Sequence, residues 1–205
     1  MNYKSENRDK LIKCAKKEFL TNGFTKASLR KIRSDAGLTT GAVYFFFKDK
    51  DGLLGAIVDE PLNKILTVLQ QHFAEDEQED FTSYVHFEGD HDELAETLVS
   101  LMYDNYDAMI ILLQKSAGSR YENIIDRIIS LTEENYLKMA QKYAEAIKGK
   151  HVNTYMLHWF CHVHINAFVH LLEHEKNRDN AMKNIKSVME FLICGWMNFI
   201  LEDDE

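Results

Sequence analysis

The sequence of 205 residues contains one proline and only nine glycines. Proteins with many tight turns rely on both residues, so this scarcity excludes a β-rich fold with many hairpins. Long helices tolerate it, and 45% of the residues are hydrophobic, which is enough for a helical core. The length suits one large helical domain, or a small domain joined to a larger one.

Cysteine and long apolar runs are scarce as well. The three cysteines, Cys14, Cys161 and Cys194, are an odd number and match no metal-binding spacing. We therefore expect reduced thiols in a cytoplasmic protein without a metal or other cofactor. The polar, charged N-terminus does not resemble a secretory signal. No apolar run approaches the ~18 residues of a membrane span, so we expect no membrane partner.

Sequence signatures of catalysis are missing too. The chain contains no nucleophile-elbow glycines, no phosphate-binding loop and no HExxH zinc motif. Its dispersed histidines have no evident catalytic partners. We therefore expect a binding protein, not an enzyme.

What the sequence does contain is a strong charge asymmetry. Residues 1–50 carry 12 Lys and Arg against 5 Asp and Glu, a net charge of +7. The other 155 residues carry 12 against 28, a net charge of −16. A basic segment on an acidic remainder is typical of a protein that meets phosphates at one end only. We predict a DNA-binding domain over 1–50 and a second helical domain over 51–205.

The basic segment has the pattern of short helices. Apolar residues from Leu11 to Leu20 show helical spacing, and Asn22-Gly23 supplies a stop. Ser28 is a good N-cap for a second helix, which Gly37 ends. A third helix begins at Thr39 or Thr40 and runs through Phe46, and Asp49 caps a fourth. This is a helix-turn-helix pattern.

Four consecutive aromatic residues, Tyr44 to Phe47, occupy the third of these helices. A helix of two turns is unstable alone and must be fixed by packing. Val43 and Phe47 are four residues apart, so we expect both to pack on the first helix. Tyr44 and Phe45 then face the other way, where a phosphate or a base edge would lie.

The remainder is predicted to be helical with few breaks. Pro61 either ends one helix and begins another or bends a continuous helix, and we favour an ordinary first-turn proline. Residues 75–90 are acidic and predict a loop. Further helices are expected over 91–114 with a break near Asn105-Tyr106, and then over 120–147, 152–175 and 180–201.

The basic segment resembles the TetR family (TetR/AcrR-like regulators) over residues 8–58. "F-x-x-x-G-F" spans Phe19 to Phe24, "SLRKIRSDAG" is similar to the family's second helix, and "LTTGAVYFFFKDKDGLL" is similar to its recognition helix and the start of its fourth. The resemblance implies an all-α fold of about nine helices, with an N-terminal three-helix DNA-binding domain. It further implies a C-terminal effector-binding and dimerisation domain.

Function follows from that resemblance as an expectation. It implies a ligand-responsive repressor that binds a palindromic operator in double-stranded DNA as a homodimer and is released by a small-molecule effector. The residues carried over to DNA contact are Ser28, Arg30, Thr39, Thr40, Gly41, Tyr44, Phe45, Lys48 and Lys50. Phe46 departs from the family pattern, because many relatives carry a polar residue there.

Two further sets are predicted in the second domain. Large residues in the last helix alternate spacings of three and four, as in a seam between helices, and we expect a dimer interface of Met182, Ile185, Met189, Leu192, Trp196 and Phe199. For the effector pocket we expect Tyr103, Tyr106, Met109, Tyr136, Met139, Trp159, His162 and Phe168.

Two alternatives remain open at this stage. His158 and His162 have the i,i+4 spacing that can ligate zinc, with Cys161 nearby, so a metal-sensing regulator is conceivable. A polar stripe of hydrogen-bonded histidines explains the same pattern. The chain could also be a helical interaction protein without DNA binding, although the +7 charge of its first 50 residues argues against that.

Overall fold

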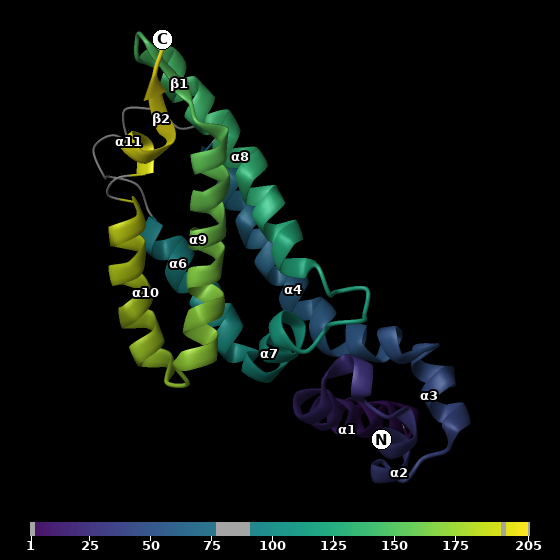
Figure 1. Ribbon diagram of the computed structural model, residues 1–205. Helices are drawn as coiled ribbons and strands as arrows, with labels where there is room; N and C mark the ends of the chain where they lie inside the picture. Colours follow the sequence, from purple (N-terminus) through teal and green to yellow (C-terminus); the bar gives the residue numbers. More distant parts are fainter. Residues whose placement is uncertain (1–2, 77–90, 194–195, 205) are drawn as a thin grey trace. The chain divides into compact units, whose positions relative to one another are not determined.

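The computed structural model describes residues 3–76, 91–193 and 196–204 (Figure 1). The chain forms two compact units, which we call the head and the body. The head comprises Met1–Lys64 and Asp104–Ile124, and the body comprises Ile65–Tyr103 and Ile125–Glu205. Most of the predicted acidic loop at 75–90, and Cys194, lie outside the described residues.

The head contains α1 (Tyr3–Lys26), α2 (Leu29–Asp35), α3 (Thr40–Phe47), the first part of α4 (Lys50–Asp76) and α7 (Tyr106–Gln114). Its breaks lie where the sequence predicted them. Gly23 interrupts α1 with a φ of 69°, and Gly37 turns the chain after α2 with a φ of 68°. Both angles favour glycine, which has no Cβ to clash.

Packing within the head follows the apolar spacing of its helices. Phe19 of α1, Ile32 of α2 and Val43 of α3 are almost fully buried, and Phe47 is 6% exposed. The prediction that Val43 and Phe47 face inward is therefore confirmed. Together these side chains hold two short helices that would be unstable alone.

A tight turn joins α3 to α4. Lys48 has a φ of 68° and a ψ of −50°, and the N–H of Asp49 donates to the carbonyl of Phe47 at 2.7 Å. These are the features of a γ-turn of the strained kind. Asp49 caps α4, because its Oδ1 accepts the N–H of Gly52 at 2.7 Å. A Cβ at Gly52 would collide with the Phe47 carbonyl, so glycine permits this close approach.

The fourth helix continues through Pro61, which lies inside α4. The expectation of a first-turn proline is therefore wrong. A proline removes one backbone donor and crowds the preceding turn, but it does not end a helix whose two sides are both well packed. Val58 and Leu62, which lie on either side of this position, are 0% and 6% exposed. Burial of the helix face thus offsets the cost of the proline.

The body contains the rest of α4 with α6 (His91–Asp104), α8 (Ile124–Ala146), α9 (Thr154–His174), α10 (Arg178–Ile193) and α11 (Trp196–Ile200). The break between α6 and α7 falls at Asn105, as predicted. The last predicted helix, 180–201, differs from the structure, because α10 ends at Ile193 and α11 is a separate short element.

A small antiparallel pair of strands was not predicted. β1 (Lys150–Val152) pairs with β2 (Leu201–Asp203), with His151 opposite Glu202. Lys150 Nζ lies 2.7 Å from Asp203 Oδ1 on the facing strand. Within the described part of the chain, no helix is both long and apolar enough to cross a bilayer.

Candidate nucleic-acid interface

The N-terminus of α2 is fixed by a buried carboxylate on α1. Glu18 is 3% exposed, its Oε1 accepts the N–H of Ser28 at 3.2 Å, and its Oε2 lies 3.0 Å from Lys31 Nζ. Burial acts to raise the pKa of Glu18, but hydrogen bonds from Lys31, Ser28 and Asn22 outweigh it and lower the pKa below 4.5. Ser28 caps α2 by accepting the N–H of Lys31 at 3.3 Å. The arrangement presents Ser28 and the exposed Arg30 at the surface.

The outer face of α3 is unusually apolar for a surface. Thr39 is the N-cap of α3, and Thr40 and Gly41 follow it, all three exposed. Tyr44 is 54% exposed and Phe45 is 66% exposed. One face of α3 therefore presents two threonines, a glycine and two aromatic rings to solvent, while the opposite face is core. Exposed aromatic residues on a helix that is otherwise packed mark a binding surface.

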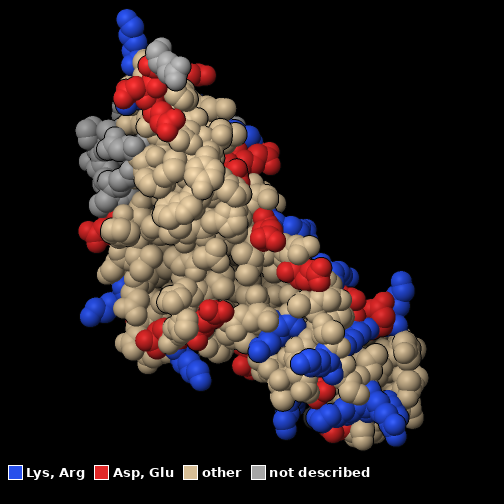
Figure 2. All heavy atoms as spheres, viewed as in Figure 1, with Lys and Arg blue, Asp and Glu red and all other residues tan. Residues whose placement is uncertain are grey.

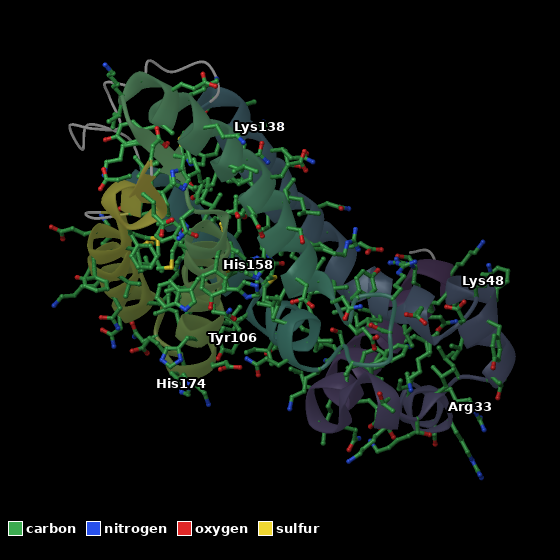
Figure 3. The ribbon with its side chains drawn as sticks, turned by 45° about the horizontal axis from the view of Figure 1, so that its top comes forward. Arg33, Lys48, Tyr106, Lys138, His158 and His174 are labelled. Carbon is green, nitrogen blue, oxygen red and sulfur yellow. The ribbon has the colours of Figure 1, made fainter. Side chains whose placement is uncertain are left out.

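Cations surround this face (Figure 2). Lys48 is exposed at the end of α3, and Lys48 and Arg33 lie at the edge of the head in Figure 3. The N-terminal turns of α1 contribute two cations that were not singled out from the sequence. Lys4 Nζ lies 4.8 Å from the centre of the Phe45 ring, and the Arg8 guanidinium lies 5.5 Å from that of Phe47. The only sequence signal for them was the net charge of residues 1–50.

Lys50 differs from the other predicted contacts. Its Nζ donates to the carbonyl of Thr25 at 3.2 Å and lies 4.7 Å from the centre of the Phe24 ring. Burial lowers the pKa of Lys50. An ammonium has three donors, so a phosphate contact remains open to it. Its observed role, however, is to hold the start of α4 against the end of α1.

A segment after α7, residues 115–121, is fastened to two other parts of the head. The N–H of Phe24 donates to the carbonyl of Lys115 at 2.7 Å, and the hydroxyl of Thr25 donates to the carbonyl of Ala117 at 2.6 Å. On the other side, Arg120 bonds to α4, as described next. We call residues 115–121 the strap.

The strap meets α4 through a polar cluster. The N–H of Arg120 donates to Asp51 Oδ1 at 2.9 Å, and Arg120 Nη2 lies 3.2 Å from Asp59 Oδ2. The Tyr121 hydroxyl donates to Asp59 Oδ1 in a short hydrogen bond. Burial, together with the Asp59 carboxylate, raises the pKa of Tyr121 to about 12, so the phenol remains protonated and keeps donating.

The residues predicted for an effector pocket fall in both units. In the head, Tyr106 is half-buried and Met109 is 2% exposed. In the body, Tyr103 donates to the carbonyl of Glu175 at 2.6 Å, and Phe168 is 8% exposed. Trp159 is 49% exposed, and its ring is tilted against that of Phe199 with centres 5.3 Å apart, so it lies on an outer face of the body and not in an interior pocket.

Tyr136 lies in the aromatic core of the body. Its ring centre is 5.6 Å from that of Trp196 and 6.0 Å from that of Phe73. Its hydroxyl lies 3.2 Å from Nδ1 of His164, a buried histidine that the sequence pattern had not indicated. Burial, with a contribution from Asp76, raises the pKa of Tyr136, which keeps the phenol neutral. Met139 packs against the same cluster, and His162 is half-buried.

The predicted dimer seam is largely covered within one chain. Ile185 is 1% exposed, Met189 is 2% exposed and Trp196 is 7% exposed, so these three have no surface left for a partner in this conformation. Met182 and Leu192 are half-buried and Phe199 is 38% exposed. The predicted spacing is present in the sequence, but Ile185, Met189 and Trp196 face the core of the body.

Five large apolar side chains of the described part of the body are exposed, and only Phe199 among them belongs to the predicted seam. They lie on α9, α10 and α11, and α9 packs against each of the other two. Phe191 is 80% exposed, and the full set is Tyr155, Trp159, Val188, Phe191 and Phe199. We call these five residues the exposed apolar set.

Comparisons with known proteins agree with this architecture. Residues 11–57 match the N-terminal domain described as bacterial regulatory proteins, tetR family. A transcriptional regulator from Aquifex aeolicus VF5 shares the fold, with a TM-score of 0.58 and 18% identity over 91% of this chain and 99% of its own. A TetR-family regulator from Syntrophomonas wolfei gives a TM-score of 0.57 and 16% identity over 93% and 96%.

A fatty acid degradation regulator from Bacillus halodurans also shares the fold, with a TM-score of 0.57 and 14% identity over 92% of this chain and 95% of its own. A search of the curated proteins gives no match to this sequence. The matched segment, 11–57, contains α2, α3 and the first turns of α4. The exposed threonines and aromatic residues of α3 and its N-cap therefore lie within it. Residues 11–57 therefore carry the N-terminal domain of the tetR family of bacterial regulatory proteins, and the chain shares the fold of the regulators named above.

Proposed function

We propose that this protein is a cytoplasmic repressor that binds a palindromic operator as a homodimer and leaves it when a small-molecule effector binds. The exposed face of α3 carries the proposal, because its threonines and aromatic rings are surrounded by cations on an otherwise packed head. We assign DNA binding to residues 1–50 and effector binding and dimerisation to residues 51–205.

In this proposal α3 enters the major groove. Thr40 and Gly41 are at its N-terminus, where a recognition helix meets base edges. Phe45 is placed to contact a thymine methyl, and Arg30 to reach a guanine. Ser28, Tyr44, Lys48 and Lys50 are then the phosphate contacts, which fix register without reading sequence.

The hydroxyl of Tyr44 offers a direct test. Tyr44→Phe removes one hydrogen bond worth about 0.5–1.5 kcal/mol in each head, or about 1–3 kcal/mol in a dimer. Operator affinity should fall roughly 5- to 150-fold, as measured by fluorescence anisotropy at fixed salt. Tyr143→Phe makes the same chemical change on α8, outside the proposed interfaces, and should leave affinity unchanged. Equal affinity for both variants and the wild type would remove Tyr44 from the interface.

A single head reaches only one half-site, so binding a palindromic operator requires a dimer. Two heads about 34–36 Å apart meet successive major grooves on one side of the duplex. The exposed apolar set supports a second copy of this chain as the partner, because large aromatic side chains are costly to leave in water and typical of interface centres. We therefore propose that the interface of the dimer is centred on these residues.

The strap supports a route by which an effector acts on the head. The chain passes between body and head at three places, and two of them bound the segment Asp104–Ile124 that contains the strap. A change in the body that pulls on either end of this segment reaches α4 through Arg120 and α1 through Thr25. An effector shifts the population of heads only if it binds one arrangement better than the other.

We propose that the effector is an aromatic or amphipathic molecule bound in the body by Tyr103, Tyr136 and Met139. Arg120→Ala should then leave operator affinity nearly unchanged and weaken effector-induced release, with Arg127→Ala on α8 as the matched control. Mass spectrometry of ligands that copurify from the native host supplies the effector. Normal release by the Arg120 variant would disprove a route through the Arg120 side chain and its ion pair with Asp59.

A further inference from the structure

The last turn of α9 gathers three possible metal ligands. His170, Glu173 and His174 each offer a donor atom, and the three atoms lie within 4.8 Å of one another. The two imidazole rings have centres 4.2 Å apart, and Glu173 Oε2 lies 3.8 Å from His174 Nε2. All three side chains are exposed, and His174 marks this end of the helix in Figure 3. Across the described ranges, no other group of three such ligands meets the same criterion.

The spacing of these residues explains why they converge. Positions i, i+3 and i+4 lie on one face of a helix, so the backbone itself brings the side chains together. The helix runs for 21 residues from Thr154 to His174, so the group lies in its last turn, which ends at the C-cap Glu175. Little further ordering is needed for the three donors to meet one ion.

The donor set indicates the class of ion. Imidazole nitrogen suits zinc, copper and nickel, whereas magnesium and calcium prefer oxygen ligands alone. Two imidazoles and one carboxylate, with room for water at the remaining positions, make an open three-ligand site. A divalent cation of the zinc, copper and nickel class therefore fits better than a hard cation.

The histidine pair predicted from the sequence is arranged differently. Nδ1 of His158 lies 2.8 Å from Glu133 Oε2, which already engages one nitrogen of its ring. His162 is next to it, with ring centres 4.5 Å apart, but no third ligand joins them by the criterion above. Burial, with the charge of Glu133, raises the pKa of the Cys161 thiol to about 12, which makes it a poor ligand at neutral pH. This pair is thus a built-in control on the same helix.

We infer that His170, Glu173 and His174 bind one transition-metal dication of this class. The same turn of α9 also anchors α6, because the Tyr103 hydroxyl donates to the carbonyls of Glu175 at 2.6 Å and Leu171 at 3.4 Å. An ion held across positions 170 to 174 would oppose fraying of this turn. The site thus stabilises the end of α9 and, through Tyr103, the contact between α9 and α6.

The test is zinc binding by the full-length protein, measured by calorimetry with zinc chloride after chelator treatment. The expected stoichiometry is one ion per chain at the tightest site. His170→Ala with His174→Ala should weaken that binding at least tenfold, and Glu173→Gln should weaken it less. His158→Ala with His162→Ala, the matched pair on the same helix, should leave it unchanged.

Melting temperatures measured with and without zinc complete the test. Zinc should raise the melting temperature of the wild type and of the His158/His162 variant, but not that of the His170/His174 variant. Without zinc the variants at 170, 173 and 174 should melt with the wild type, because these side chains are exposed. Unchanged zinc affinity in the His170/His174 variant, or its loss in the His158/His162 variant, would overturn the assignment.

Discussion

Lys48 has a strained backbone conformation and carries a positive charge next to the proposed DNA surface. One substitution distinguishes the two contributions, because it should change stability and DNA binding in opposite directions. Lys48→Gly removes the cation from the end of α3 and places glycine at a φ of 68° and a ψ of −50°. Non-glycine residues in such conformations cost roughly 1–3 kcal/mol. Glycine avoids that cost but adds about 0.4–1 kcal/mol of chain entropy to be lost on folding.

The substitution should therefore stabilise the protein while weakening DNA binding. The net gain in unfolding free energy is about 0.5–2 kcal/mol, and each kcal/mol raises the melting temperature by about 2–4 °C in a chain of this size. Loss of one phosphate contact in each head lowers the slope of log K against log salt by about 1.8 for a dimer. Between 50 and 200 mM salt, the wild type should lose about tenfold more affinity than the variant.

Both quantities are measured on the same preparation, by urea unfolding and by anisotropy with a labelled duplex at several salt concentrations. Lys48→Arg keeps the charge and the strain and should behave as the wild type. Lys148→Gly removes the same charge from an exposed turn of the body and should leave the salt slope unchanged. A Lys48→Gly variant that is less stable than the wild type, or that has the wild-type salt slope, would refute the reasoning.

Two other predictions concern stability and assembly. Glu18→Gln should lower the unfolding free energy by about 1.5–3 kcal/mol at pH 7, because a buried charged acceptor is lost. Since folding lowers the pKa of Glu18, its stabilisation is present above pH 4.5 and is lost as the pH falls through the lowered value. A difference in unfolding free energy that does not shrink as the pH is lowered further contradicts this. Phe191 is 80% exposed, so Phe191→Ala should weaken the free energy of dimerisation by about 2–5 kcal/mol, as measured by analytical ultracentrifugation. Ile185 is 1% exposed, so Ile185→Ala should mainly lower the melting temperature. Unchanged dimerisation of the Phe191 variant would exclude this face as the interface.

The helices of the head could be predicted because their signals are local. Ser28 caps α2, Gly37 turns the chain and Asp49 caps α4, each through a bond within three residues or through its own φ. The inward direction of Val43 and Phe47 follows from spacing alone. The family resemblance rested on the same contiguous stretch, which is why it could be recognised in one sequence.

Features that depend on distant parts of the chain could not be predicted in this way. Helix α4 continues through Pro61 because its flanking residues are buried, which no local pattern reveals. The pairing of β1 with β2 joins residues about 50 positions apart.

The dimer seam shows a different limit. An a/d stripe reports that one face is apolar, not whether it faces its own chain or a partner. Ile185 and Met189 face the core of the body, whereas Phe191, which lies outside the stripe, is 80% exposed.

The most direct measurement is selection of binding sites from random duplex DNA by the full-length protein. We expect an enriched inverted repeat whose half-sites are centred about 10 base pairs apart or at a multiple of that spacing. The Phe45→Ala variant should lose preference at one position of each half-site, while a body variant such as Tyr143→Phe selects the same repeat. Enrichment of no sequence, or of a single site without an inverted copy, would contradict the assignment of α3 as the reading element of a dimer.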